Sequence, residues 1–279
     1  PKRRPCTTIR AAMLLSTRTG PHAGRHTSAP PERCNHDEWS EVMSTRSQRV
    51  VLVTGGTKGI GRTIATAFLD AGDLVVVCAR QAPESPVVGD DGREAEPWVC
   101  NVRDTDAVAQ MFDHIAARYG RLDVLVNNAG GAPHTDAAKA SPRFHASIID
   151  LNLTAPLHLA QRAFALMDAG DGGVIVNICS VSGTRASPGT AAYGAAKAGL
   201  LSLTKSLAVE WAPRVRVTAV VAGLIETEQA HLHYGDDAGI ARVAATVPLG
   251  RLGKPSDVAK ACVFLASDDA SYVSGAALT

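Results

Sequence analysis

Short apolar runs recur along the chain from about residue 50 onward, and each is apolar on consecutive rather than alternating positions. Runs of this kind, rich in Val, Ile and Leu, are typical of strands in a parallel sheet that is covered on both faces. We predict strands over Val50–Thr54, Leu74–Cys78, Trp98–Cys100, Val124–Asn127, Val174–Ile178 and Val215–Val221.

The stretches between these runs have helical periodicity. Two stripes of apolar residues at helical spacing follow the first and third runs: Ile60, Ile64 and Phe68, and then Val108, Met111, Phe112 and Ile115. Gly72 is placed to end the first helix, and Asp104 or Thr105 can cap the second. Two longer continuous helices are predicted over residues 143–167 and 191–211.

Strand and helix alternate throughout residues 43–279. This order predicts an α/β fold: a single doubly wound, Rossmann-type parallel sheet with helices on both faces and right-handed crossovers. We find neither an internal repeat nor a second domain in this span.

The first 42 residues differ from the rest, because residues 1–31 contain six Lys or Arg and no acid. Such a stretch cannot bury enough apolar surface to fold. Residues 1–42 are therefore a disordered or non-native extension: in-frame sequence upstream of a start at Met43, an Arg-rich targeting leader, or a native disordered arm. Its scattered potential ligands, His22, His26, Cys34 and His36, lack metal-site spacing, and we expect no metal.

Composition narrows the possible functions of this 279-residue chain. No apolar run reaches the roughly 18 residues of a membrane-spanning helix, so no membrane partner is expected. A net charge of +1 and only 4% aromatic residues argue against nucleic-acid binding. Cysteines are not spaced as CxxC, and Cys78, Cys100 and Cys179 fall in apolar runs, which predicts buried free thiols and a reducing, cytoplasmic location.

The first predicted strand leads into a glycine-rich turn over residues 55–61, Gly-Gly-Thr-Lys-Gly-Ile-Gly, and then into a helix. Glycines let a backbone approach a pyrophosphate closely, and a helix N-terminus presents free N–H groups to it. A glycine turn in this context predicts a dinucleotide site.

Further motifs follow in order. Asn127-Asn128-Ala129-Gly130 follows the fourth run, Ser180 follows the fifth, and Tyr193-Gly194-Ala195-Ala196-Lys197 begins thirteen residues after Ser180. Together with the TGxxxGxG spacing of the turn, these motifs resemble the short-chain dehydrogenase/reductase family over essentially all of residues 48–279. The resemblance implies an oxidoreductase that uses a nicotinamide cofactor.

Tyr193 and Lys197 lie one turn apart on a predicted helix and share a face. A phenol has an ordinary pKa near 10, and we expect the neighbouring ammonium to lower it so that Tyr193 can exchange a proton with a substrate oxygen. Ser180 can hydrogen-bond the carbonyl. The resemblance implies that Lys197 also bonds the nicotinamide ribose and that Asn152 supports a proton relay, although Asn152 could instead be a helix-bend residue.

The glycine turn and the resemblance together predict a set of cofactor-binding residues: Gly55, Thr57, Lys58, Gly59, Ile60, Gly61, Arg80, Asn101, Val102, Asn128, Ala129, Gly130, Tyr193, Lys197, Gly223, Ile225 and Thr227. An NAD site usually has an acid at the end of the second strand, about 20 residues beyond the turn. Here that position falls near Ala79, and Arg80 follows. Arg80 and Lys58 favour NADP(H) over NAD(H), unless Arg80 is only a solvated loop residue.

The sequence departs from the family pattern at several positions. Asn101 stands where the family usually has Asp, Thr218 where it has Asn, and Ala222 where it has Pro, which bears on the rigidity of the cofactor loops more than on the chemistry. The chain stops at Thr279 within the expected last strand, so we expect a truncated C-terminal end that affects assembly.

Residues 226–249 should form a lid that does not identify the substrate. We expect a reductase of ketones or 3-oxoacyl thioesters. A hydroxysteroid or sugar-alcohol dehydrogenase, a non-catalytic NADP-binding sensor and a methyltransferase are the alternatives. Asn152, Ser180, Tyr193 and Lys197 together favour catalysis, and excess apolar surface on the two long helices predicts a homodimer or homotetramer.

Overall fold

Seven parallel strands form one sheet in the order β3-β2-β1-β4-β5-β6-β7. The computed structural model describes residues 48–279 except 229 and 232–234, so the extension over residues 1–42 and its histidines and Cys34 lie outside the described residues. The strands are β1 (Val50–Thr54), β2 (Leu74–Ala79), β3 (Glu96–Val99), β4 (Val124–Asn127), β5 (Gly173–Ser180), β6 (Val215–Ala222) and β7 (Ala277–Leu278).

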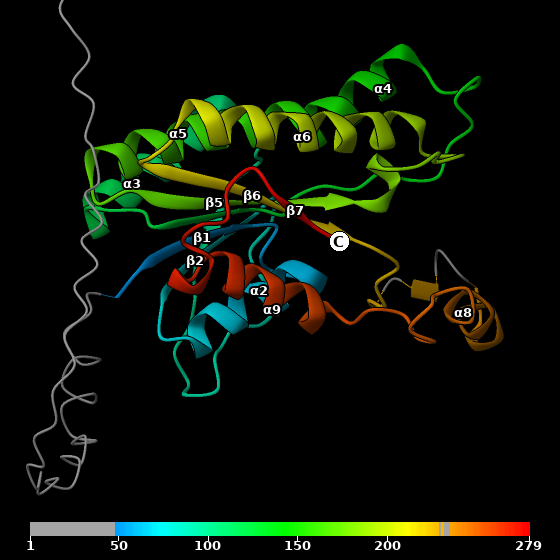
Figure 1. Ribbon diagram of the computed structural model, residues 1–279, viewed down its shortest axis with the longest axis horizontal. Helices are drawn as coiled ribbons and strands as arrows, with labels where there is room; N and C mark the ends of the chain where they lie inside the picture. Colours follow the sequence, from blue (N-terminus) through cyan, green and yellow to red (C-terminus); the bar gives the residue numbers. More distant parts are fainter. Residues whose placement is uncertain (1–47, 229, 232–234) are drawn as a thin grey trace, which may run out of the picture. The chain divides into compact units, whose positions relative to one another are not determined.

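Helices cover both faces of the sheet, as predicted. The α-helices of the described residues are α2 (Gly59–Asp70), α3 (Thr105–Tyr119), α4 (Pro142–Ile149), α5 (Ala155–Ala169), α6 (Ala191–Glu210), α8 (Asp237–Ala244) and α9 (Pro255–Leu265). Figure 1 shows α3, α5 and α6 on one face and α2 and α9 on the other. None of the helices in the described part of the chain is long and apolar enough to cross a bilayer.

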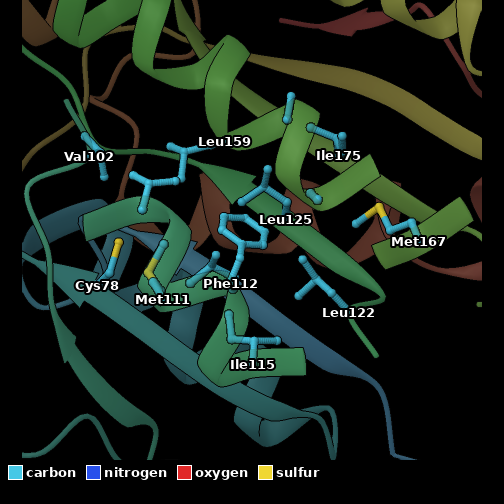
Figure 2. Close-up of a cluster of buried hydrophobic side chains, with 14 of the residues drawn as sticks. Cys78, Val102, Met111, Phe112, Ile115, Leu122, Leu125, Leu159, Met167 and Ile175 are labelled. Atoms are coloured by element: carbon cyan, nitrogen blue, oxygen red, sulfur yellow. The ribbon is translucent and has the colours of Figure 1, made fainter. Parts of the chain in front are cut away.

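The continuous apolar character of the strands follows from this layering. In β1, Val50 and Leu52 pack into the core on one face, whereas Val51 and Val53 pack into the core on the other. Figure 2 shows the first of these cores, in which Phe112 of α3 lies among side chains from the sheet and from α5. Because helices cover both faces, most positions of a central strand are apolar, and buried polar residues such as Asn127 and Asn177 are hydrogen-bonded to each other.

The predicted start of α3 is confirmed in detail. Asp104 is the N-cap, and its carboxylate accepts hydrogen bonds from the backbone N–H groups of Asp106 and Ala107. All members of the predicted stripe are buried, and Gly72, placed to end α2, lies just beyond that helix with φ of +94°. The thiols of Cys78, Cys100 and Cys179 are buried and free, as expected.

The helical stretch predicted over residues 143–167 is confirmed, but it is not one regular α-helix. The chain forms α4, a π-helical turn over Asp150–Thr154, and α5 with no loop between them. Pro156 lacks the N–H that would bond the carbonyl of Asn152 in a regular α-helix, which explains a break here. The Asn152 side chain donates to the carbonyls of Ile148 and Gly131, at 2.9 and 3.0 Å, and so ties the wide turn to a neighbouring loop.

The third strand also differs from the prediction, because it begins at Glu96 and ends before Cys100. It is the edge strand of the sheet, and its residues alternate between half-buried and exposed positions. Pro97, which has no N–H to donate, is tolerated at such an edge. A search for continuous apolar runs cannot find an alternating edge strand in full.

Candidate active site

A cleft of about 550 Å³ opens at the carboxyl ends of the strands. The order of the sheet reverses at β1, which lies between β2 and β4, and such a switch point is where open α/β sheets bind ligands. Most of the predicted site residues line this cleft: Gly55, Thr57, Lys58, Gly59, Ile60, Gly61, Arg80, Asn128, Ala129, Gly130, Ser180, Tyr193, Lys197, Gly223, Ile225 and Thr227. The fold therefore brings together residues from six separate segments.

Asn101 and Val102 are predicted cofactor residues that do not line the cleft. The Asn101 side chain is exposed and accepts hydrogen bonds from Arg103, and Val102 is buried in the core beside α3. Both predictions came from the family resemblance, and a cofactor-binding role of these two residues stays a prediction.

The glycine turn is closed by contacts that leave no room for side chains. A Cβ atom on Gly61 would lie 2.2 Å from the carbonyl oxygen of Gly55 and 2.4 Å from Nδ2 of Asn128. The Asn128 amide donates to the carbonyl of Thr54 at 2.9 Å, and its backbone N–H donates to the Thr54 hydroxyl at 3.0 Å. Gly55 has φ of +65°, in the left-handed region that favours glycine.

The start of α2 leaves its backbone donors open toward the cleft. Its N-cap is Lys58, whose side chain makes no capping hydrogen bond, and the first turn contains no acid. Uncapped N–H groups and the positive end of the helix dipole attract an anion. With the tight turn before it, this helix start fits the pyrophosphate of a dinucleotide.

The predicted chemical groups gather at the other end of the cleft. Ser180 is the last residue of β5, Tyr193 and Lys197 lie on the first turns of α6, and the Ser180 and Tyr193 side chains are hydrogen-bonded. The Lys197 ammonium lies 5.7 Å from the centre of the Tyr193 ring and donates to the carbonyl of Ile178 at 2.8 Å. A substrate oxygen beside Ser180 and Tyr193 would meet two hydroxyl groups.

The expected net lowering of the pKa of Tyr193 is not found in this structure. Burial raises the pKa of the Tyr193 phenol above its ordinary value, and the hydrogen bond with Ser180 opposes that rise only in part. Burial also lowers the pKa of Lys197 to about 8, since only 3% of this residue is exposed. At neutral pH, Tyr193 is a protonated phenol and therefore a proton donor.

Asn152 does not line the cleft, but it lies close to Lys197, which does. It is fully buried, and its Oδ1 accepts from the N–H of Gly131 at 2.9 Å. A Cβ atom on Gly130 would lie 2.6 Å from this Oδ1 and 3.4 Å from Nζ of Lys197. The π-helical turn thus places Asn152 near Lys197. Asn152 is a helix-bend residue, and its part in a proton relay stays a prediction.

The two cations that suggested NADP(H) lie together in a side cavity of about 470 Å³ that adjoins the cleft. Thr57, Lys58 and Arg80 line both spaces, and the side cavity also contains Glu84. Glu84 forms an ion pair with Lys58, in which Nζ of the lysine lies 2.8 Å from Oε1 of the carboxylate. Sequence reasoning missed this carboxylate because it lies in an irregular segment after β2.

Several other residues of the cleft were not predicted as site residues: Gly131, Ile178, Cys179, Ala222 and Glu228. Gly131 directly follows Gly130, and Cys179 directly precedes Ser180. Their proximity along the chain to predicted site residues could have identified them. Burial raises the pKa of the Cys179 thiol to about 11, so the thiol stays neutral. Glu228 comes from the predicted lid, and its carboxylate reaches to 3.7 Å from where a Cβ of Gly59 would lie.

No group of three or more His, Cys, Asp or Glu in the described ranges is arranged to hold a metal ion. The cleft presents hydroxyl, phenol, amide and ammonium groups beside an anion-binding turn. Such a set can orient a polar group, donate a proton to it and bind a phosphorylated ligand beside it.

Comparison with known proteins agrees with this arrangement. The model of the family described as enoyl-(acyl carrier protein) reductase matches residues 55–279. The chain is 35% identical over 234 residues to 3-oxoacyl-(acyl-carrier-protein) reductase of Thermotoga maritima, covering 81% of this chain and 94% of that protein. It is also 35% identical over 238 residues to 3alpha-hydroxysteroid dehydrogenase of Mediterraneibacter gnavus, covering 83% and 94% of the two chains.

Among solved structures, a variant of actinorhodin polyketide ketoreductase with NADPH superimposes with a TM-score of 0.75. It is 32% identical in sequence, and the match covers 83% of this chain and 95% of that chain. The parallel sheet with helices on both faces is therefore shared with enzymes of the same family.

Proposed function

The chain belongs to the short-chain dehydrogenase/reductase family and is an oxidoreductase, and from this premise we propose that it reduces a ketone with NADPH. Its preferred substrate is a 3-oxoacyl thioester or a similar carbonyl compound. One observation carries the proposal: Ser180, Tyr193 and Lys197 converge at one end of a cleft whose other end is an open, uncapped helix start. The sensor alternative explains only the second of these features.

In this proposal the bound nicotinamide supplies a hydride to the carbonyl carbon. Ser180 and Tyr193 hydrogen-bond the carbonyl oxygen, and their hydroxyl groups fix its position. Tyr193 then donates its proton to that oxygen as negative charge develops there. The raised pKa of Tyr193 supports the reductive direction, because the phenol carries its proton at neutral pH.

Lys197 acts behind Tyr193. Its ammonium, held by the Ile178 carbonyl, stabilises the phenolate that remains after proton transfer. Asn152 holds the Gly130–Gly131 backbone beside Lys197 and can support the return of a proton through water. These residues act on the proton and not on the hydride.

The preference for NADP(H) over NAD(H) rests on charge. Arg80 and Lys58 lie where a 2′-phosphate would reach the side cavity, and Ala79 brings no carboxylate to the end of β2. A carboxylate about 4 Å from a phosphate charge would repel it by roughly 4 kcal/mol at an effective dielectric constant of 20. The presence of NADPH in the related ketoreductase supports the same choice.

A second substrate class, hydroxysteroids, is favoured by the 3alpha-hydroxysteroid dehydrogenase match, whose identity equals that of the 3-oxoacyl reductase. Sugar alcohols remain a less favoured alternative. Activity measurements separate these substrate classes.

Assembly and location are further parts of the proposal. We infer a homodimer or homotetramer through α5 and α6, supported by Val209 on α6, which is 80% exposed. Light scattering coupled to gel filtration measures this mass directly. Free buried thiols support a reducing compartment such as the cytoplasm.

The test of the function follows NADPH absorbance with residues 43–279, a short 3-oxoacyl thioester and a panel of bulky cyclic ketones. Faster NADPH loss with the thioester supports the first substrate class, and faster loss with a steroid ketone supports the second. NADPH binding by a folded protein without loss of absorbance on any carbonyl would contradict the reductase and favour the sensor.

A further inference from the structure

A carboxylate, that of Glu84, lines the side cavity to which our proposed function assigns the cofactor's 2′-phosphate. Glu84 pairs with Lys58 at 2.8 Å, and both residues line the side cavity together with Arg80. Lys58 is also the N-cap of α2, so the pair extends from the start of the phosphate-binding helix to the segment after β2. One of the two cations expected to hold a phosphate is thus already engaged by an anion.

The position of Glu84 is built into the fold, although the side chain itself is exposed. Pro83 and Pro86 flank the Glu84–Ser85 pair and restrict its backbone. The guanidinium of Arg62, on α2, donates to the carbonyls of Ser85 and Pro86 directly after Glu84. The same helix therefore carries the glycine turn and fixes the segment that presents the carboxylate.

A second set of contacts anchors the rest of this segment. Val87 is 1% exposed and packs into the core with α2, and Arg93 donates to the carbonyls of Leu69 and Gly72, each at 3.0 Å. Since residues 85–93 are tied to α2 and to the residues directly after it, the backbone at Glu84 is held close to Lys58. Its carboxylate can still rotate away, because 85% of the side chain is accessible to solvent.

We propose that Glu84 is a specificity-determining residue of the cofactor site, which pairs with Lys58 and thereby weakens the binding of 2′-phosphorylated dinucleotides. The inference rests on the proposed use of NADP(H). A 2′-phosphate entering the side cavity must either displace Glu84 from Lys58 or accept its repulsion. A ligand with a free 2′-hydroxyl does neither, so Glu84 narrows the preference for NADPH over NADH that Arg80 and Lys58 establish.

The size of the effect follows from exposure. Exposed ion pairs are weak and screened by salt, and a pair of this kind corresponds to roughly a threefold to fivefold change in a dissociation constant. Because the pair is screened, the effect should shrink as ionic strength rises from about 0.01 M to 1 M. A selective effect of this size on one class of ligand is measurable by calorimetry.

The experiment titrates wild type, Glu84→Gln and Glu94→Gln with four ligands: NADPH, NADH, adenosine 2′,5′-bisphosphate and 5′-AMP. Glu94 lies in the same segment, is exposed and lines neither cavity, so its variant controls for net charge. Glu84→Gln should tighten binding of the two 2′-phosphorylated ligands by roughly threefold to fivefold and leave NADH and 5′-AMP within about twofold. Glu94→Gln should change none of the four by more than about twofold.

A double-mutant cycle identifies the partner of Glu84. In the background of Lys58→Gln, the substitution Glu84→Gln should lose most of its effect on adenosine 2′,5′-bisphosphate, because the cation that it releases is gone. A full effect in that background would assign the change to general repulsion and overturn the pairing.

The outcomes separate this inference from the proposed function. An equal change for phosphorylated and non-phosphorylated ligands overturns the inference while leaving NADP(H) use intact. Weaker NADH binding in Glu84→Gln also overturns it, since Glu84 would then bind a ribose hydroxyl. A wild type that prefers NADH over NADPH contradicts the proposed cofactor, whereas the selective tightening of adenosine 2′,5′-bisphosphate would still support the role of Glu84.

Discussion

The two ends of the cleft are built in opposite ways. At the chemical end, Lys197 and Asn152 are buried, and each is tied to backbone groups by hydrogen bonds of 2.8 to 3.0 Å. At the phosphate end, Lys58 and Arg80 are exposed, and the start of α2 has no side-chain cap. The same cleft therefore joins a dry, fixed group of side chains to an open, charged backbone turn.

The difference reflects two tasks. Proton transfer needs groups that keep one geometry and whose pKa values differ from those in water, and burial favours both. Anion binding needs donors that are accessible before the ligand arrives, and backbone N–H groups provide them without side-chain ordering. Substitutions at the two ends should therefore change different constants: binding at the phosphate end, turnover and stability at the chemical end.

The largest effect at the phosphate end is expected from Gly61→Ala. The new Cβ would lie 2.2 Å from the carbonyl of Gly55, so the turn must open and the N–H groups of α2 must move. We expect NADPH affinity to fall by roughly a hundredfold, equivalent to losing about two hydrogen bonds to charged groups. Fluorescence titration measures the affinity, and circular dichroism confirms the fold. Unchanged affinity would mean that the turn does not contact the cofactor.

At the chemical end, Lys197→Met should separate stability from activity. Below pH 8 the lysine is charged in both the folded and the unfolded state, so the folded state bears the full cost of burying the ammonium. This cost decreases as pH rises from about 8 and is absent above about 10.5. Allowing for the lost bond to Ile178, we expect the variant to gain about 2 kcal/mol of stability at pH 7 and to lose turnover.

Urea unfolding at pH 7 and at pH 10.5 measures this gain. The increase should be present at pH 7 and small at pH 10.5. A variant less stable than wild type at both values would show that the ammonium stabilises the fold, contrary to the separation of tasks proposed for the two ends.

The pH dependence of the turnover rate should report the charge of Lys197. Lys197 has a pKa of about 8 in the folded protein, so its charge disappears as pH rises above that value. We expect the turnover rate to fall by up to roughly tenfold per pH unit above this point, while NADPH affinity changes little. A turnover rate that is flat to pH 10 would exclude a role for this charge.

The smallest effect is expected from Arg80→Gln. Arg80 is exposed, so its contribution to phosphate binding is screened by solvent and salt. We expect NADPH to bind roughly fivefold more weakly, with NADH unchanged and the difference reduced at about 1 M salt. Equal weakening of both cofactors would indicate a packing role for Arg80.

How far the sequence predicts this molecule depends on whether a feature is local. The strand β1, the glycine turn and the Asp104 cap are short-range patterns, and they were predicted at the right residues. A helix over Asp150–Thr154 was predicted, with Asn152 as an alternative bend residue. Its π-helical form was not, because the hydrogen bonds of Asn152 reach a loop about 20 residues away.

Burial and loop placement were harder to predict. The pKa of Tyr193 shifts opposite to the expectation because desolvation outweighs the hydrogen bond with Ser180, and a sequence does not reveal how deeply a side chain lies. Glu84 was missed because its position depends on bonds from Arg62 in a different element. Asn101 and Val102 were placed at the cofactor site by the family pattern alone, and they stay predictions because neither lines the cleft.

The most direct test of the two-ended cleft measures NADPH binding and turnover together in Tyr193→Phe. The variant keeps the ring and removes only the hydroxyl group that donates the proton. We predict NADPH affinity within about twofold of wild type and a loss of turnover of roughly a hundredfold to ten-thousandfold. Turnover equal to that of wild type would contradict proton donation by Tyr193, and with it the division of the cleft into a binding end and a chemical end.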